Sequence, residues 1–129
     1  MNLRYEVDDA TLTAEAFLEL VQQIWPRDYD RAYIQRALAR TCNITAWDGR
    51  KLVGCVRILT DGYLFGTIPE ILVAPAYRRQ GIGSHLLALA WDASPTSLFL
   101  GAQPGNEGFF EKTGFTKSMQ SYMRKKERP

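Results

Sequence analysis

The sequence lacks any run of apolar residues long enough to span a membrane, and it lacks the polar, proline-rich or glycine/serine-rich tracts that mark disorder. The opening stretch, residues 1–6, has no apolar segment of signal-peptide form. We therefore expect a soluble, cytoplasmic protein with no membrane partner.

The sequence also has a small net charge and only two cysteines. Sixteen Lys and Arg residues against fourteen Asp and Glu residues leave a net charge of +2, too small to indicate a nucleic-acid partner. The basic run Arg124-Lys125-Lys126 is interpreted as a solvated charge run in a terminal tail. Cys42 and Cys55 are expected to be buried thiols, because disulfides are rare in proteins that are not secreted. We expect no metal cofactor.

What the chain does contain is the composition of one globular domain, residues 1–129, with 46% apolar and 23% charged residues. Apolar residues at helical spacing predict a helix over residues 14–24, with Thr13 as its cap. A second helix is predicted to begin near Asp28 or Asp30 and to end before Cys42. These two helices are expected to form a lid or flank.

The rest of the chain predicts an α/β (α+β) fold, with a central mixed sheet and helices on both of its faces. Asp48-Gly49 is predicted to join two strands in a hairpin, and a third strand is predicted to be interrupted at Pro69. Further helices are predicted over 81–91 and 107–113. The predicted strand regions are residues 3–7, 43–47, 52–59, 63–73 and 98–102, followed by one or two more over 115–123.

The most informative segment is an apolar strand, Ile71 to Tyr77, followed by Arg78-Arg79-Gln80-Gly81-Ile82-Gly83-Ser84 at the start of a helix. The first N–H groups of a helix have no internal partner and lie at the positive end of its dipole, so they bind phosphate. The third glycine of a dinucleotide site is absent, because position 86 is Leu, and no Gly-Lys-Ser/Thr follows. Two glycines alone are equally compatible with close helix–strand packing.

Two ordered motifs resemble the signature of the GCN5-related N-acetyltransferase (GNAT) superfamily. The first joins Val73, Pro75, Tyr77-Arg78, Gly81-Ile82-Gly83 and Leu86-Leu87 at the family's spacing. The second is Phe109-Phe110-Glu111-Lys112-Thr113-Gly114-Phe115, similar to the later motif Phe-Tyr-x-x-x-Gly-Phe. With the order of elements, the likeness extends from Asn43 to Met123.

The resemblance implies that acetyl-coenzyme A (acetyl-CoA) is the co-substrate. The main chain of residues 79 to 84 would hold the pyrophosphate, and a splayed pair of parallel strands, 71–73 and 98–102, would hold the pantetheine arm. The cofactor-binding residues implied are Ile71, Val73, Arg78, Arg79, Gln80, Gly81, Ile82, Gly83, Ser84, Gln103 and Phe110.

Catalytic roles follow from the same resemblance. Glu70 is the candidate general base, with an ordinary exposed strand carboxylate as its alternative. The N–H of Val73 is the candidate donor to the acetyl oxygen. Phe110 stands where the family commonly has a tyrosine that protonates the leaving sulfur, so water or Tyr122 would have to replace it, and Gln103 stands where many members have Asn.

The function predicted is N-acetyl transfer to a primary amine, most simply of a small molecule, by a monomer or homodimer. Trp25, Tyr29 and Tyr33 are expected either to make an aromatic wall for the acceptor or to pack in the core. His85 is expected to be solvated. Two alternatives stay open: a non-catalytic acyl-CoA sensor or partner module, suggested by Phe110, and an acetyltransferase that acts on protein N-termini or lysines.

Overall fold

The central hairpin of the computed structural model, which describes residues 2–129, joins β2 (Cys42–Asp48) to β3 (Lys51–Thr60). Gly49 in the turn has a φ of 61°, which glycine adopts without steric cost. β1 (Leu3–Glu6) pairs antiparallel with β2. β4 (Gly66–Thr67) and β5 (Ile71–Val73) both pair antiparallel with β3, and Pro69 lies in the interruption between them.

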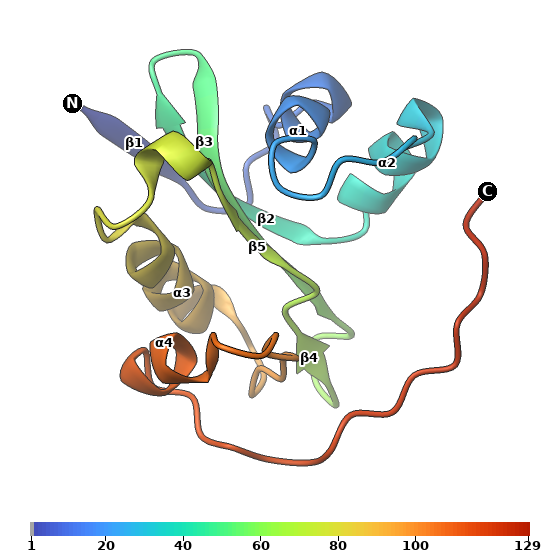
Figure 1. The fold of residues 1–129 in the computed structure, drawn as a ribbon, viewed down its shortest axis with the longest axis vertical. Helices are drawn as coiled ribbons and strands as arrows, with labels where there is room; N and C mark the ends of the chain where they lie inside the picture. Colours follow the sequence, from blue (N-terminus) through green and yellow to red (C-terminus); the bar gives the residue numbers. More distant parts are fainter. Residues whose placement is uncertain (1) are drawn as a thin grey trace.

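Helices cover both faces of this sheet, as predicted (Figure 1). α1 (Ala14–Val21) and α2 (Arg31–Leu38) lie on one face, and α3 (Ile82–Ala93) and α4 (Glu107–Lys112) lie on the other. The predicted caps are confirmed: Thr13 Oγ1 accepts from the N–H of Ala16 at 3.1 Å, and Asp30 Oδ1 accepts from that of Tyr33 at 3.1 Å.

The core lies between the sheet and the two helical layers. α3 packs so closely on β3 that a Cβ added at Gly54 would lie 3.0 Å from both Ile82 Cγ2 and Leu86 Cδ1. This close approach fixes the start of α3 against the sheet. Both cysteines are free thiols; Cys55 is buried, and burial raises the pKa of its thiol, whereas Cys42 is half-buried.

Two strand predictions are wrong. Among residues 2–129, the segment 98–102 contributes only a single parallel bridge, from Phe99 to Thr67, because Gly101, Pro104 and Gly105 disfavour a longer strand. Residues 115–123 form no strand, since the mainly polar segment from residue 116 onward is exposed and has no face to bury. The splayed parallel pair is therefore one bridge followed by diverging chains, and the sheet itself is antiparallel.

The segment after α4 runs without regular structure around the molecule and ends on the side of α2 (Figure 1). We call residues 116–129 the tail. Within residues 2–129, none of the helices has the length and apolar character that crossing a lipid bilayer requires.

Candidate functional site

A row of main-chain N–H groups without acceptors lies between η1 (Pro75–Tyr77) and the first turn of α3. Within residues 2–129, no protein oxygen accepts a hydrogen bond from the amides of residues 79–84, and the first helical bond runs from His85 N–H to Gly81 O at 3.0 Å. Arg79 and Gly81 are left-handed, with φ of 64° and 81°. Such residues turn successive N–H groups into an anion-binding concavity, which we call the amide cradle.

The left-handed conformation of Arg79 costs about 1–2 kcal/mol for a residue with a Cβ. Backbone strain of this kind persists where the surrounding structure holds it, commonly at ligand-binding sites. One such restraint is visible: Tyr77 OH donates to Asp48 Oδ2 at 2.6 Å, and Lys51 Nζ lies 5.4 Å from the Tyr77 ring centroid. The hydrogen bond to Asp48 raises the pKa of Tyr77. The β2–β3 turn thus anchors the chain that enters the cradle.

The strand before the cradle is bonded on one edge only. Ala74 N donates to Val53 O at 2.8 Å and Arg57 N to Glu70 O at 3.5 Å, so the main-chain groups of residues 70, 72 and 74 face β3. By alternation, those of Ile71 and Val73 face the other way. Among the donors of residues 2–129, Arg78 Nε alone bonds the Val73 carbonyl there, at 3.2 Å. β5 therefore presents an open edge that leads away from the cradle.

Opposite this open edge the chain returns at Phe99. Phe99 N donates to Gly66 O at 3.0 Å, and Ile68 N donates to Phe99 O at 2.9 Å. After Pro69 the two segments diverge and enclose a cavity of about 130 Å³, which we call the inner cavity. It is lined by Trp25, Ile68, Pro69, Glu70, Ile71, Leu100, Gly101, Gln103, Asn106 and Phe110.

Phe110 contributes an apolar ring to the lining of the inner cavity. It is 8% exposed and packs edge-on against Phe109 and Phe115, with centroids 5.1 Å and 5.9 Å away. Gln103 lines the same cavity. The two residues that depart from the family pattern therefore lie together beside the open edge of β5.

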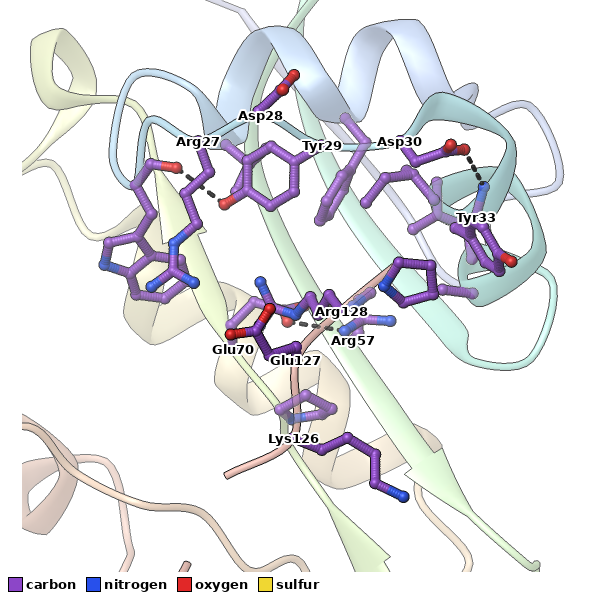
Figure 2. Close-up of a pocket in the computed structure, with 18 of the residues that line it drawn as sticks. Arg27, Asp28, Tyr29, Asp30, Tyr33, Arg57, Glu70, Lys126, Glu127 and Arg128 are labelled. Carbon is purple, nitrogen blue, oxygen red and sulfur yellow. Dashed lines mark hydrogen bonds and ion pairs between the residues drawn. The ribbon is translucent and has the colours of Figure 1, made fainter. Parts of the chain in front are cut away.

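A second, larger cavity of about 960 Å³, the outer cavity, lies under the lid helices (Figure 2). Trp25, Tyr29 and Tyr33 all line it; Trp25 and Tyr33 are exposed, and Tyr29 also packs against the core. Residues 123–129 of the tail line it as well. The inner and outer cavities share Trp25, Pro69 and Glu70, so they adjoin at these residues.

Glu70 stands at this junction as one half of an ion pair (Figure 2). Arg57 Nη2 donates to Glu70 Oε1 at 2.8 Å, and Arg57 Nε donates to Oε2. The side chains are only 16% and 13% exposed. Although burial by itself disfavours the charged guanidinium, the hydrogen bonds that Arg57 donates to Glu70 raise the pKa of Arg57. Glu70 is thus a partly buried, paired carboxylate and not the exposed strand residue of the alternative interpretation.

Two other candidates lie away from the cavities. Tyr122 is 89% exposed and bonds only to Gln120, at 3.2 Å, among residues 2–129. It lines neither cavity, so the structure does not bring it to Phe110. His85 is exposed on α3 and stacks on Tyr5, with centroids 4.1 Å apart.

Sequence reasoning missed Arg57 and Asp48. A signal for Arg57 existed, because a charged residue inside the apolar strand 52–58 requires a partner of opposite charge. Asp48 carried no such signal, since an acid before a turn glycine is common in hairpins without any further role.

A sequence model of the acetyltransferase (GNAT) family matches residues 10–115. No curated protein sequence matches the chain. Among solved structures, a GNAT family acetyltransferase from Streptococcus pneumoniae TIGR4 is similar over 97% of this chain and 100% of its own, with 23% identity and a TM-score of 0.78.

Two further structures name their substrates. The aminoglycoside N-acetyltransferase AAC(6')-Iy, solved in complex with CoA, has 15% identity and a TM-score of 0.73 over 97% of this chain and 95% of its own. A ribosomal-protein-alanine N-acetyltransferase from Brucella melitensis biovar Abortus 2308 has 21% identity and a TM-score of 0.74 over 97% and 99%. At these identities the likeness shows the fold alone.

Proposed function

The chain belongs to the acetyltransferase (GNAT) family, and on that premise we propose that it transfers the acetyl group of acetyl-CoA to a primary amine of a small molecule. The observation that carries the proposal is the order of three features along the chain. The amide cradle follows the open edge of β5, Ile71 of β5 lines the inner cavity, and the inner cavity adjoins the outer cavity at Glu70.

The residues present suit the coenzyme. The unbonded amides of residues 79–84 are donors for a pyrophosphate, and Arg78 and Arg79 add positive charge beside them. The main-chain groups of Ile71 and Val73 on the open edge of β5, with the Gln103 amide, would bond the amides of the pantetheine arm. Bound there, acetyl-CoA supplies an acetyl group activated as a thioester.

Removing a proton from the acceptor is the task we assign to Glu70. An alkylammonium has a pKa near 10.4, so its neutral form costs about 4–5 kcal/mol at neutral pH. Both Glu70 oxygens accept from Arg57, but each carboxylate oxygen has a second lone pair. We propose that Glu70 accepts the proton through that lone pair, directly or through one water, while Arg57 holds the carboxylate in place.

The remaining groups act on the acetyl carbonyl and the leaving thiol. The N–H of Val73 faces away from β3 and is the proposed donor to the acetyl oxygen as negative charge develops on it. Phe110 packs in the inner cavity and has no proton to give. A thiol has a pKa of only about 8.5, so departure as a thiolate is tolerable with water as the proton source.

The small-molecule assignment rests on the outer cavity. Its volume of about 960 Å³ is within the range of about 300–1,000 Å³ usual for small-ligand sites, and aromatic faces line it. AAC(6')-Iy, a protein of the same fold, was solved with an acetylneamine-type bisubstrate analogue, which is an aminoglycoside-derived amine compound attached to CoA. The second candidate function, a non-catalytic acyl-CoA sensor, is favoured by Phe110.

Calorimetry tests the binding half of the proposal. CoA and acetyl-CoA should both bind, and Gly81→Ala should weaken binding by about tenfold or more, because charge-assisted hydrogen bonds from displaced amides are worth about 1.5–3 kcal/mol each. Gly62→Ala is the matched control, since Gly62 also has a positive φ, 88°, with nothing within 4 Å of an added Cβ. It should destabilise the protein similarly and leave CoA binding unchanged.

Thiol release tests the catalytic half. Mixing acetyl-CoA with a panel of small amines should release free CoA, and the product should be the amide of one amine. Binding without turnover on any amine or peptide would favour the sensor. Turnover on peptide N-termini and not on small amines would move the assignment to protein acetylation.

A further inference from the structure

The tail begins beside the inner cavity. Phe115 N donates to Phe110 O at 3.1 Å, and the two rings pack edge-on with centroids 5.9 Å apart. Phe110 in turn lines the inner cavity. The start of the tail is therefore held by Phe110, a residue that lines the inner cavity.

The tail then returns to the site from the other side. Residues 123–129 line the outer cavity together with Glu70 and the lid aromatics (Figure 2). Tyr122 OH donates to the Gln120 side chain within the tail, and no tail side chain makes a hydrogen bond or ion pair with the rest of residues 2–129. Every tail residue is exposed. The tail thus lines the cavity without a side-chain hydrogen bond or ion pair to the rest of the described chain, so its side chains can reorient.

Charge favours this placement. The lid and sheet contribute the acids Asp28, Asp30 and Glu70 and the cations Arg27 and Arg57 to the outer cavity. Glu70 and Arg57 pair with each other, and among residues 2–129 no ion pair includes Asp28, Asp30 or Arg27, so two unpaired acids face the tail beside one unpaired cation. The tail contributes four basic residues and one acid to the same cavity: Arg124, Lys125, Lys126 and Arg128, with Glu127. A basic segment beside unpaired acids is attracted to them, more strongly at low salt.

We propose that Lys125 and Lys126 are sites of self-acetylation, modified by the active site of their own chain; this rests on the proposed function. The Nζ lone pair of a lysine forms the new bond to the acetyl carbonyl carbon of acetyl-CoA. The carbon–sulfur bond breaks, and its electron pair leaves with the sulfur. The amine proton passes to Glu70 or water, the thiolate takes a proton from solvent, and the products are an amide and free CoA.

Tethering makes this reaction efficient. Phe115 fixes one end of the tail at the inner cavity, and a flexible chain of about ten residues spans about 16–19 Å on average. A short flexible tether holds its end group at an effective concentration in the millimolar range. Lys125 and Lys126 therefore compete with a free acceptor that is present at lower concentration.

The other lysines serve as internal controls, because Lys51, Lys112 and Lys117 line neither cavity. Purified chain incubated with acetyl-CoA should gain acetyl groups, and peptide mapping should place them on Lys125 or Lys126. The rate constant should not change over a hundredfold dilution of the protein, and excess free CoA should suppress the reaction. Lys125→Arg combined with Lys126→Arg keeps both charges and should abolish the modification.

A second measurement tests the placement without any coenzyme. A carbodiimide joins a lysine amine directly to a carboxylate only when the two touch. In the free chain, tail lysines should crosslink to Asp28, Asp30 or Glu70, and Lys117 should not. Crosslinks of Lys117 alone, or none to these acids, would overturn the placement on which the proposal depends.

The remaining outcomes separate this proposal from the proposed function. Acetylation spread evenly over all lysines is non-enzymatic chemistry and overturns self-acetylation, as does a rate constant that rises with protein concentration. Turnover of a small amine with an unmodified tail also overturns it and leaves the proposed function standing. A chain that binds no CoA overturns both.

Discussion

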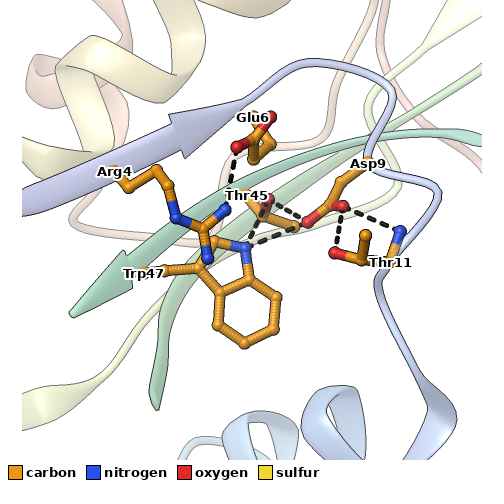
Figure 3. Close-up of polar contacts among 6 residues, drawn as sticks. All are labelled: Arg4, Glu6, Asp9, Thr11, Thr45 and Trp47. Atoms are coloured by element: carbon orange, nitrogen blue, oxygen red, sulfur yellow. Dashed lines mark hydrogen bonds and ion pairs between the residues drawn. The ribbon is translucent and has the colours of Figure 1, made fainter. Parts of the chain in front are cut away.

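Replacing Asp9 with alanine is expected to lower the free energy of unfolding by about 2–4 kcal/mol. The Asp9 carboxylate is buried, at 8% exposure, in the connection between β1 and α1 (Figure 3). It accepts from Thr11 N at 2.9 Å and Thr11 Oγ1 at 2.6 Å, and from Thr45 Oγ1 at 2.7 Å and Trp47 Nε1 at 3.0 Å.

The size of this loss in the free energy of unfolding depends on which donors have no other acceptor once the Asp9 carboxylate is removed. Thr11 is exposed and can bond to water instead, whereas Thr45 is fully buried and loses its acceptor. Trp47 Nε1 keeps one acceptor, Thr45 Oγ1 at 2.9 Å. A buried donor left unsatisfied costs about 1–3 kcal/mol, and hydrogen bonds to a charged group make a net contribution of about 1.5–3 kcal/mol each.

The loss should depend on pH. Burial alone raises the pKa of Asp9, but hydrogen bonds from Thr11, Thr45 and Trp47 outweigh it and bring the pKa below the usual 3.8. A carboxyl group with a pKa lowered by folding stabilises the protein above its unfolded pKa, and this contribution is lost as pH falls through the folded pKa. The difference between the parent chain and Asp9→Ala should therefore be full at pH 7 and shrink below about pH 4.

Urea unfolding at pH 7, 5 and 3.5 measures this difference, and thermal unfolding should show a loss of about 3–5 °C per kcal/mol. Asp92→Ala, at an exposed position of α3, is the control and should change stability by less than about 0.5 kcal/mol. A loss under 1 kcal/mol for Asp9→Ala at pH 7, or a loss that stays constant down to pH 3.5, would refute the reasoning.

Three further predictions concern the site. Glu70→Gln should lower kcat by about 10²- to 10⁴-fold while the calorimetric Kd for CoA stays unchanged, because a general base contributes that much; a lost Kd would instead assign Glu70 to binding. Phe110→Tyr should raise kcat in a thiol-release assay if the chain is an enzyme that lacks a general acid, and unchanged kcat would show that water already suffices. Tyr77→Phe should weaken CoA binding by about 2- to 13-fold, because the hydrogen bond to Asp48 that anchors the cradle is worth about 0.5–1.5 kcal/mol. Tyr63→Phe is its control, since Tyr63 is 86% exposed, and equal effects of the two variants would contradict the anchoring role.

The helices and the central hairpin could be predicted because their signals are local. Thr13 and Asp30 cap helices through a neighbouring amide, and Gly49 turns the hairpin through its own φ. The cradle was also predictable, since two glycines at a helix start act through the backbone. The fold class followed from the order of these elements.

The tail and the ion pair could not be predicted in the same way. Whether residues 115–123 form a strand depends on a distant edge that would have to pair with them, and no local pattern reports that edge. The partner of Glu70 depends on register: Val56 lies opposite Ile71, which brings the adjacent residues Arg57 and Glu70 together across the strands. Aromatic side chains such as Trp25 have the same spacing in a core and in a cavity wall, so only the fold distinguishes the two.

Pro69 has a consequence for the solubility of the free chain. A strand with a bare edge is a template on which other chains can assemble into aggregates, and the risk grows with the length of the uninterrupted edge. Proline has no N–H to offer and breaks such a template. Because Pro69 separates β4 from β5, the bare edge on this side of the sheet is limited to the three residues Ile71–Val73, which is too short to be an effective template for assembly with other chains.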